Sequence, residues 1–202
     1  MYIFLTTRNG TVKKSNLDEF ENIRKNGIAA IKLDAGDELV WSKLTSGKDD
    51  ILLITNKGMA IRFNEKSVRP TGRATRGVRG IKLKKEDKVI GMDLINETLS
   101  KSSKLLIVMA NGIGKVSPVT DFKTQNRSGM GIKCANVNPK TGEVIFAKIV
   151  PEDAKELLLT SVKGQVVKLP INRVPVRSRV TQGVILMRFS HKEDFLAAAT
   201  CL

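Results

Sequence analysis

A fourfold internal repeat constrains the fold of this chain more than any other feature of its sequence. Each repeat has an apolar run, a short polar pair and a glycine, and the four copies align without gaps. They are Phe4–Gly10, Leu52–Gly58, Leu106–Gly112 and Leu158–Gly164. The glycines are 48, 54 and 52 residues apart, and a large apolar side chain lies ten residues after each one. These side chains belong to Phe20, Val68, Phe122 and Val174. A period near 50 residues indicates a chain built from four similar units.

Each unit has the pattern of an antiparallel β-sheet. The pairs Asn9-Gly10 and Asn111-Gly112 are hairpin signals, because Asn and Gly supply the positive φ that a two-residue turn needs. A second glycine recurs later in each unit, followed by an acidic turn and another apolar run. The second glycines are Gly27, Gly77, Gly129 and Gly183. No amphipathic helix of three turns is evident, so each unit is predicted to be strand, turn, strand, loop, strand, turn, strand.

Four-stranded units at this period are typical of the blades of a propeller or a related radial array. We therefore predict an all-β, propeller-like fold of four blades that forms a single domain over residues 1–202. The repeats are predicted to cover about residues 1–47, 48–99, 100–152 and 153–202. The WD dipeptides and glycine doublets of two common propeller classes are missing. The sequence leaves open whether the four units close into a ring or form an open arc.

The composition argues against an enzyme, a metal site and a membrane protein. One His and two Cys without ligand spacing leave few groups for catalysis or metal binding. No P-loop or complete dinucleotide fingerprint occurs, and the acidic pairs recur at one repeat position, which favours turns. No apolar run approaches the ~20 residues of a membrane span. We predict a cytoplasmic, non-catalytic domain without cofactor or metal.

Positive charge is concentrated in the last three repeats. The chain has 35 Lys and Arg residues against 20 Asp and Glu, a net charge of +15. Residues 1–50 are neutral overall, whereas residues 51–100, 101–150 and 151–202 carry net charges of +6, +6 and +3. From Lys66 to Lys85 the chain has no acidic residue. A stripe of this kind favours a polyanionic partner.

The cations recur in the region that follows the hairpin of each repeat. In the last three repeats the candidate DNA-binding residues are Arg69, Arg73, Arg76, Arg79 and Lys82, then Lys115, Lys123, Arg127 and Lys133, then Arg173, Arg177 and Arg179. The first repeat offers Arg24 and Lys25. Radial repetition would bring these regions onto one rim, and double-stranded DNA bent around that rim is the predicted partner. Turn glycines such as Gly77 and Gly129 would let the backbone approach.

The predicted contacts are with phosphates rather than with bases. Aromatic residues make up 4% of the chain, too few for base-stacking platforms, and no helix is available for the major groove. Arg can bind a phosphate with two hydrogen bonds. Two other readings of the charge remain: a solvated cationic face that aids solubility, and a propeller-like interaction module for an acidic protein.

Several motifs resemble the C-terminal domain of DNA gyrase A. They are Arg69–Leu83 (RPTGRATRGVRGIKL), Gly114–Pro118 (GKVSP), Gln125–Lys133 (QNRSGMGIK) and Ser178–Val184 (SRVTQGV). The resemblance covers essentially all 202 residues and corresponds to the last four blades of that domain, which usually has five or six. The family's signature box, Gln-Arg-Arg-Gly-Gly-Lys-Gly, is missing. The related component of topoisomerase IV is the nearest competitor.

The resemblance implies a β-pinwheel, in which blades exchange a strand with their neighbours. It implies a domain that wraps DNA around a basic rim and performs no chemistry itself, while the parent complex introduces negative supercoils using ATP. The partners implied are duplex DNA, the N-terminal catalytic part of the same polypeptide, and gyrase B in an A2B2 complex of the bacterial cytoplasm and nucleoid. The cleaving tyrosine of the family lies in the N-terminal part, so Tyr2 does not inherit that role.

Overall fold

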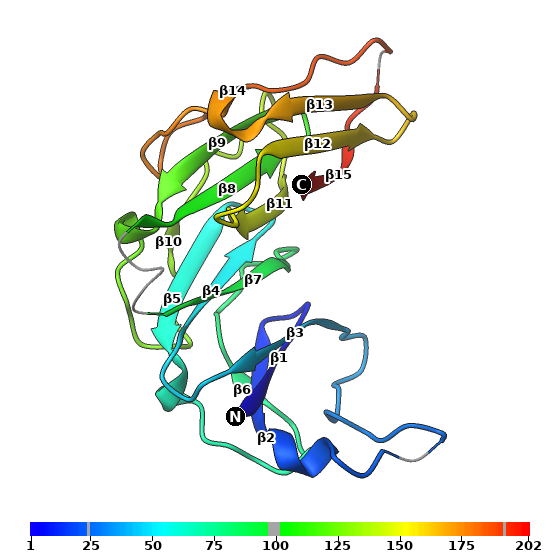
Figure 1. The fold of residues 1–202 in the computed structure, drawn as a ribbon, viewed down its shortest axis with the longest axis vertical. Helices are drawn as coiled ribbons and strands as arrows, with labels where there is room; N and C mark the ends of the chain where they lie inside the picture. The colour runs from blue at the N-terminus through cyan, green and yellow to red at the C-terminus, as the bar shows by residue number, and fades with distance from the viewer. Residues whose placement is uncertain (24, 97–101, 192) are drawn as a thin grey trace.

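The computed structural model describes residues 1–23, 25–96, 102–191 and 193–202. Four antiparallel sheets, called blades 1 to 4 in chain order, follow one another along the chain and form an open arc (Figure 1). The predicted all-β fold of four units is therefore confirmed. Arg24 and the repeat boundary predicted near residue 99 lie outside the described residues.

Each sheet is built mainly from one repeat. Blade 1 contains β3 (Leu39–Thr45), β1 (Tyr2–Thr7), β2 (Thr11–Asn16) and β6 (Val78–Arg79). Blade 2 contains β10 (Ile132–Lys133), β5 (Met59–Asn64), β4 (Asp50–Thr55) and β7 (Val89–Ile95). Blade 3 contains β11 (Val144–Ile149), β8 (Lys104–Met109), β9 (Ile113–Pro118) and β14 (Val184–Ile185). Blade 4 has only three strands, β13 (Val166–Pro170), β12 (Glu156–Ser161) and β15 (Leu196–Cys201).

A short 3₁₀ helix follows the second strand of each repeat. These helices are η1 (Leu17–Phe20), η2 (Glu65–Ser67), η3 (Val119–Asp121) and η4 (Ile171–Arg173). The residues that follow η2, η3 and η4 are the apolar side chains found ten positions after the repeat glycines, and all three are buried. The sequence pattern predicted no helix at these positions, because a single 3₁₀ turn is too short to produce a helical periodicity.

The hairpins form where the sequence predicts them. The glycines of all four hairpin turns have positive φ, between 76° and 85°, at Gly10, Gly58, Gly112 and Gly164. Each glycine N–H donates to the carbonyl three residues earlier, for example Gly10 to Thr7 at 3.1 Å and Gly164 to Ser161 at 3.1 Å. A β-branched or bulky residue would be strained at this φ, which explains why glycine marks the repeat.

Neighbouring blades exchange a two-residue strand. β6, β10 and β14 come from the repeat that follows the sheet they complete, and they pair with β2, β5 and β9 respectively. Before each exchanged strand a glycine packs against the backbone of the preceding blade, where an added Cβ would lie 2.3–2.6 Å from a carbonyl oxygen. These glycines are Gly77, Gly131 and Gly183. In the third repeat the glycine at this junction is Gly131, two residues after the Gly129 of the sequence pattern.

Among the described residues blade 4 has three strands, and no exchanged strand pairs with β13. Its outer strand β13 alternates between exposed and half-buried residues, and Val166 is 57% exposed. The prediction of four-stranded blades is thus met in three sheets and not in the last. Among the described residues no strand pairing joins blade 4 to blade 1, and Figure 1 shows the two ends of the chain well apart on an open arc.

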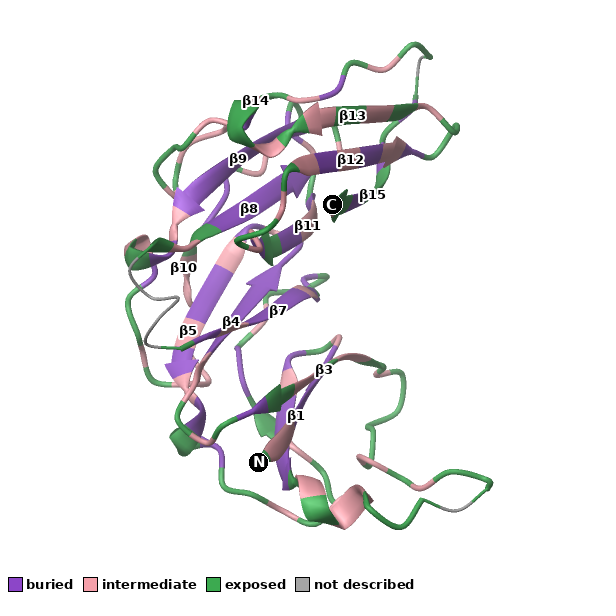
Figure 2. Ribbon diagram, viewed as in Figure 1, coloured by how far each residue is buried: buried purple, intermediate pink, exposed green. Residues whose placement is uncertain are grey.

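The core consists of three apolar layers between successive blades. One cluster lies between blades 1 and 2 and includes Phe4 and Phe63, a second lies between blades 2 and 3 around Phe122, and a third includes Leu106 and Leu159 between blades 3 and 4. Figure 2 shows β4, β5, β8 and β9 as mostly buried. Stacking of this kind fixes each blade against its neighbours and so fixes the path of the outer edge.

Candidate nucleic-acid interface

Three loops carry most of the predicted DNA-binding residues. We call them the exchange loops; they cover residues 68–82, 122–133 and 173–185 and contain the exchanged strands. In Figure 1 they succeed one another along the convex side of the arc, while β7, β11 and β15 face its concave side. On that side the equivalent strands of neighbouring blades contact one another: β3 contacts β7, β7 contacts β11, and β11 contacts β15. Repetition of the blade therefore places the same loop at successive points of one edge.

Eight of the twelve predicted cations are accessible on these loops, and their charged side-chain groups form no ion pair within 4.0 Å among the described residues, although the backbone N–H of Arg73 donates to the Glu19 carboxylate at 2.8 Å. They are Arg69, Arg73, Arg79, Lys82, Lys123, Lys133, Arg173 and Arg177. Arg73 is half-buried and the other seven are exposed. We call this set the loop cations. A row of unpaired cations along one edge attracts an extended polyanion because its potential adds over the row.

Arg76 differs from the loop cations because blade 1 supplies it with an acid. Its guanidinium lies 3.4 Å from a carboxylate oxygen of Asp34, and both side chains are more than 60% exposed. A pair this exposed contributes little to stability, about 0–1 kcal/mol. Because the pair is weak, Arg76 can exchange Asp34 for another anion at a small cost.

Arg127 and Arg179 connect successive exchange loops. Arg127 Nη1 donates to the carbonyl of Arg79 at 3.0 Å, and Arg179 Nη1 donates to the carbonyl of Lys133 at 2.8 Å. Arg127 Nε also donates to the carbonyl of Ser67 at 3.1 Å. Both arginines are half-buried. They set the spacing between loops and keep their remaining N–H donors for other acceptors.

Lys115 is not on the surface, and its prediction as a phosphate contact is wrong. The residue is 0% exposed on β9. Its ammonium donates to the carbonyls of Ser178, Arg179 and Thr181 at 2.9, 2.6 and 2.8 Å. Burial lowers the pKa of Lys115 to about 8. All three donors of the ammonium are used inside the protein, so none is left for DNA.

Lys13 has the same environment near the other end of the arc. It occupies the equivalent repeat position on β2, three residues after the hairpin glycine, and is 1% exposed. Its ammonium donates to Ser15 Oγ and to the carbonyls of Ala30 and Arg73 at 2.8–2.9 Å. Burial also lowers the pKa of Lys13. The sequence contains one sign that this position is buried: the corresponding residue of the second repeat, Ile61, is apolar.

In blades 1, 2 and 4 an acidic turn ties the hairpin to the last strand of the blade. Asp37 accepts the backbone N–H of Asn9 at 2.9 Å, Asp87 accepts that of Lys57 at 3.1 Å, and Asp194 accepts that of Lys163 at 3.0 Å. The recurring contact explains why an acid occupies the same position in three repeats. Among the described residues no group of three or more potential metal ligands occurs.

The thiols show no sign of activation. Cys134 is fully buried, and burial raises its pKa to about 12. Burial also raises the pKa of Cys201, which is half-buried. A reactive thiol needs a lowered pKa and access to solvent, and Cys134 lacks both.

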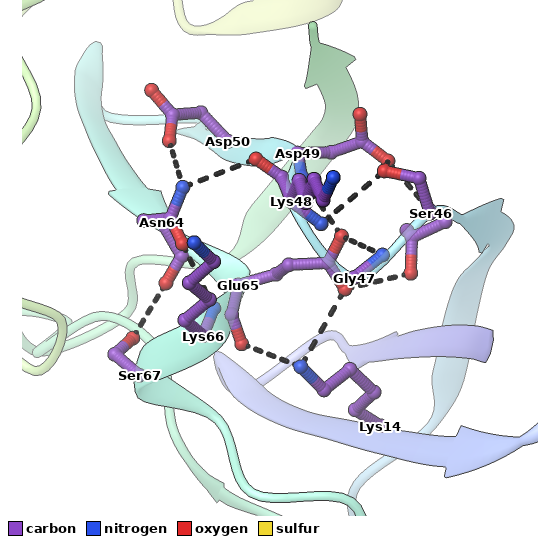
Figure 3. Close-up of polar contacts among 11 residues, drawn as sticks. Lys14, Ser46, Gly47, Lys48, Asp49, Asp50, Asn64, Glu65, Lys66 and Ser67 are labelled. Carbon is purple, nitrogen blue, oxygen red and sulfur yellow. Dashed lines mark hydrogen bonds and ion pairs between the residues drawn. The ribbon is translucent and has the colours of Figure 1, made fainter. Parts of the chain in front are cut away.

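One important residue was not predicted from the sequence: Glu65, at the start of η2. It is 0% exposed, and its carboxylate accepts hydrogen bonds from Thr45 Oγ1 and from the N–H groups of Gly47 and Asp49 at 2.8–2.9 Å. The ammonium of Lys14, also buried, lies 3.6 Å from the carboxylate and donates to the Glu65 carbonyl at 2.8 Å (Figure 3). The corresponding residues of the other repeats, Leu17, Val119 and Ile171, are apolar. Glu65 therefore fixes the segment that connects blade 1 to blade 2 through these hydrogen bonds.

No helix among the described residues is long and apolar enough to cross a membrane.

The chain is similar to known proteins over nearly its whole length. It is 43% identical over 198 residues to DNA gyrase A of Chlamydia pneumoniae, covering 97% of this chain and 23% of that protein. It is 36% identical over 187 residues to DNA gyrase A of Staphylococcus epidermidis, covering 93% of this chain and 21% of that protein. It thus spans less than a quarter of these relatives.

Two solved structures share the fold. The C-terminal domain of DNA topoisomerase IV superposes with a TM-score of 0.88 at 23% identity, over 98% of this chain and 61% of that one. The DNA gyrase A C-terminal domain superposes with a TM-score of 0.81 at 28% identity, over 98% and 64%. The model of one family, described as the DNA gyrase C-terminal domain, beta-propeller, matches residues 2–46, 49–96, 104–151 and 155–202. The chain therefore belongs to the DNA gyrase C-terminal domain family.

Proposed function

We propose that this chain is a non-catalytic domain that binds duplex DNA and bends it around the convex side of the arc. The observation that carries the proposal is the row of loop cations, repeated on three successive exchange loops, whose charged groups form no ion pair with an acid of the described residues. Each loop cation is directed at a phosphate. Because the loops lie along a curved edge (Figure 1), a duplex that meets all three must bend.

The rest of the surface favours contacts with the DNA backbone. Among the described residues Phe195 is the one exposed aromatic side chain, and single-strand binders need several. The four helices that lie wholly within the described residues are single 3₁₀ turns of three or four residues, too short to enter a major groove. Phosphate contacts fix position without reading sequence. Selectivity would come from the bendability of the DNA.

In the intact protein we place this domain in a gyrase A polypeptide, joined to an N-terminal catalytic part and assembled with gyrase B in an A2B2 complex. The chemistry of strand cleavage and ATP hydrolysis would lie in those other parts. The contribution of this chain would be to hold a bent segment of DNA, which supports negative supercoiling in the bacterial cytoplasm and nucleoid. Membership of the gyrase C-terminal domain family supports this placement.

Salt dependence tests the binding itself. Each phosphate contact is expected to contribute about −0.9 to the slope of log K against log salt concentration, so contacts from all eight loop cations give a slope of about −7. Titration of the chain against a duplex of fixed length at several salt concentrations measures this slope. Affinity should differ little between duplexes of unrelated sequence. A slope near zero, or absence of binding at low salt, would overturn the proposal.

A further inference from the structure

The carbonyl oxygens of the last exchange loop converge on a single buried group. The carbonyls of Ser178, Arg179 and Thr181 all accept hydrogen bonds from Lys115 Nζ within 2.9 Å. An ammonium has three N–H donors, so the three carbonyls use all of them. Such convergence of carbonyl dipoles is unfavourable without a cation at its centre. The path of this loop therefore depends on Lys115.

Few other contacts of the described residues hold this stretch of the loop. Arg177 N–H donates to the carbonyl of Val116 at 2.8 Å, and Val116 N–H donates to the carbonyl of Pro175 at 3.1 Å. Thr181 N–H closes a turn onto the Ser178 carbonyl at 3.2 Å. These bonds lie at the start of the segment or within it. Between Arg177 and the exchanged strand β14, Arg179 Nη1 donates to the carbonyl of Lys133 in blade 2 at 2.8 Å, and Lys115 supplies the hydrogen bonds to blade 3.

The arrangement occurs twice, at equivalent positions of the repeat. Lys13 binds the carbonyl of Arg73 as Lys115 binds that of Arg179, and these two arginines occupy the same place relative to their exchanged strands. Where the equivalent residue is Ile61, other groups tie the loop to its neighbour: Ser128 N–H donates to the carbonyl of Gly80 at 2.7 Å and Ser128 Oγ to that of Arg79 at 2.9 Å. The other two exchange loops thus each rest on a buried lysine.

We propose that Lys115 and Lys13 are positioning residues for DNA binding: each buried ammonium fixes the backbone of the exchange loop supplied by the next repeat, and so holds its arginines at the convex edge. The predicted effect on DNA binding rests on the proposed function. The predicted effect on the loop backbone does not depend on DNA. Neither lysine touches the duplex. The predicted cations nearest to the anchored backbone are Arg73 in one loop and Arg177 and Arg179 in the other.

The proposal gives DNA binding a pH dependence. Burial lowers the pKa of Lys115 to about 8, and the charged or titratable groups that act on it are Cys134, Asp121 and Arg179. Above that pH the amine is neutral and keeps two N–H donors for three carbonyls. In water the side chains of free lysine and arginine ordinarily carry their charge up to about pH 10. Because Lys115 loses its ammonium charge as the pH rises, the affinity for duplex DNA should fall between pH 7 and pH 9.

The test compares Lys115→Met with two matched variants of the full chain. Lys13→Met removes the other buried ammonium, and Lys148→Met removes an exposed charge from β11 on the concave side. In Lys115→Met, amide hydrogen exchange over residues 176–183 should become about tenfold faster, as expected for loss of charged hydrogen bonds. Lys13→Met should instead speed amide hydrogen exchange over residues 72–75. Lys148→Met should leave amide hydrogen exchange unchanged in both segments.

Duplex affinity is measured on the same variants at pH 7 and pH 9. Lys115→Met should bind about tenfold more weakly at pH 7, in keeping with a shift of that size in the loop equilibrium, and should lose much of the fall in affinity seen in the parent chain between the two pH values. Unchanged exchange over residues 176–183 in Lys115→Met overturns the positioning role, whatever the DNA result. Absence of duplex binding by the parent chain overturns the proposed function, while the exchange data still decide the role of Lys115.

Discussion

Replacing Arg69, Arg79 and Lys82 together with glutamine is expected to weaken duplex binding by about two to three orders of magnitude at about 0.1 M salt. Each phosphate contact raises the association constant for DNA by a factor of roughly eight at this salt concentration. All three side chains are exposed and have no acidic partner among the described residues, so their loss leaves the fold intact. The salt slope should become less negative by about three, and the loss should be equal for duplexes of different sequence.

A matched variant removes the same net charge elsewhere. Lys88, Lys140 and Lys148 are exposed, and none lies on an exchange loop. Their replacement with glutamine should weaken binding less than about tenfold, since only long-range attraction is lost. Equal losses in the two triple variants would show that net charge, and not its placement on the convex side, determines binding. Loss of binding to one sequence only would contradict backbone recognition.

Replacing Glu65 with alanine is expected to destabilise the chain by about 3–5 kcal/mol, the range found when one partner of a buried charge pair is removed. The carboxylate is 0% exposed and accepts three hydrogen bonds of 2.8–2.9 Å. Its removal leaves the N–H groups of Gly47 and Asp49 without this acceptor and the buried ammonium of Lys14 without its counterion (Figure 3). Equilibrium denaturation with urea, followed by circular dichroism, measures the effect.

Glu156 provides the control for this substitution. Its carboxylate pairs with Lys168 at 2.9 Å, but the two side chains are 40% and 56% exposed. Glu156→Ala should therefore cost less than about 1 kcal/mol. If Glu65→Ala also changes the free energy of unfolding by less than about 1 kcal/mol, Glu65 does not hold blades 1 and 2 together.

The architecture followed from the sequence because it depends on local signals that repeat. Gly10 and Gly112 mark turns that need positive φ, and the first strands of repeats 2 and 3 are mostly apolar because nearly all of their residues are buried. The exchanged strands have only two residues each, so no periodicity reports them. Their existence was implied by the family resemblance and not by the pattern of residues.

The candidate site was predicted as a region rather than residue by residue. A count of charges does not separate an exposed Lys123 from a buried Lys115, because Lys123 lies in a loop whereas Lys115 lies on β9, which is buried along nearly its whole length. Alignment of the repeats contains that information, since Ile61 occupies the position of Lys115 and Lys13. Glu65 was missed because an isolated acid in a 3₁₀ turn looks like an ordinary surface residue. Only the contacts across the blade junction show its role.

Bending of bound DNA tests the central claim most directly. Ligase-catalysed circularisation of a duplex of about 150 base pairs, close to one persistence length, is slow unless the DNA is bent. If the duplex follows the convex side of the arc, saturating amounts of the chain should raise the circularisation rate at least about tenfold, since each 1.4 kcal/mol of bending energy supplied in advance is worth a factor of ten. The variant lacking Arg69, Arg79 and Lys82 should give a much smaller increase. A saturated complex that circularises no faster than free DNA would contradict the account.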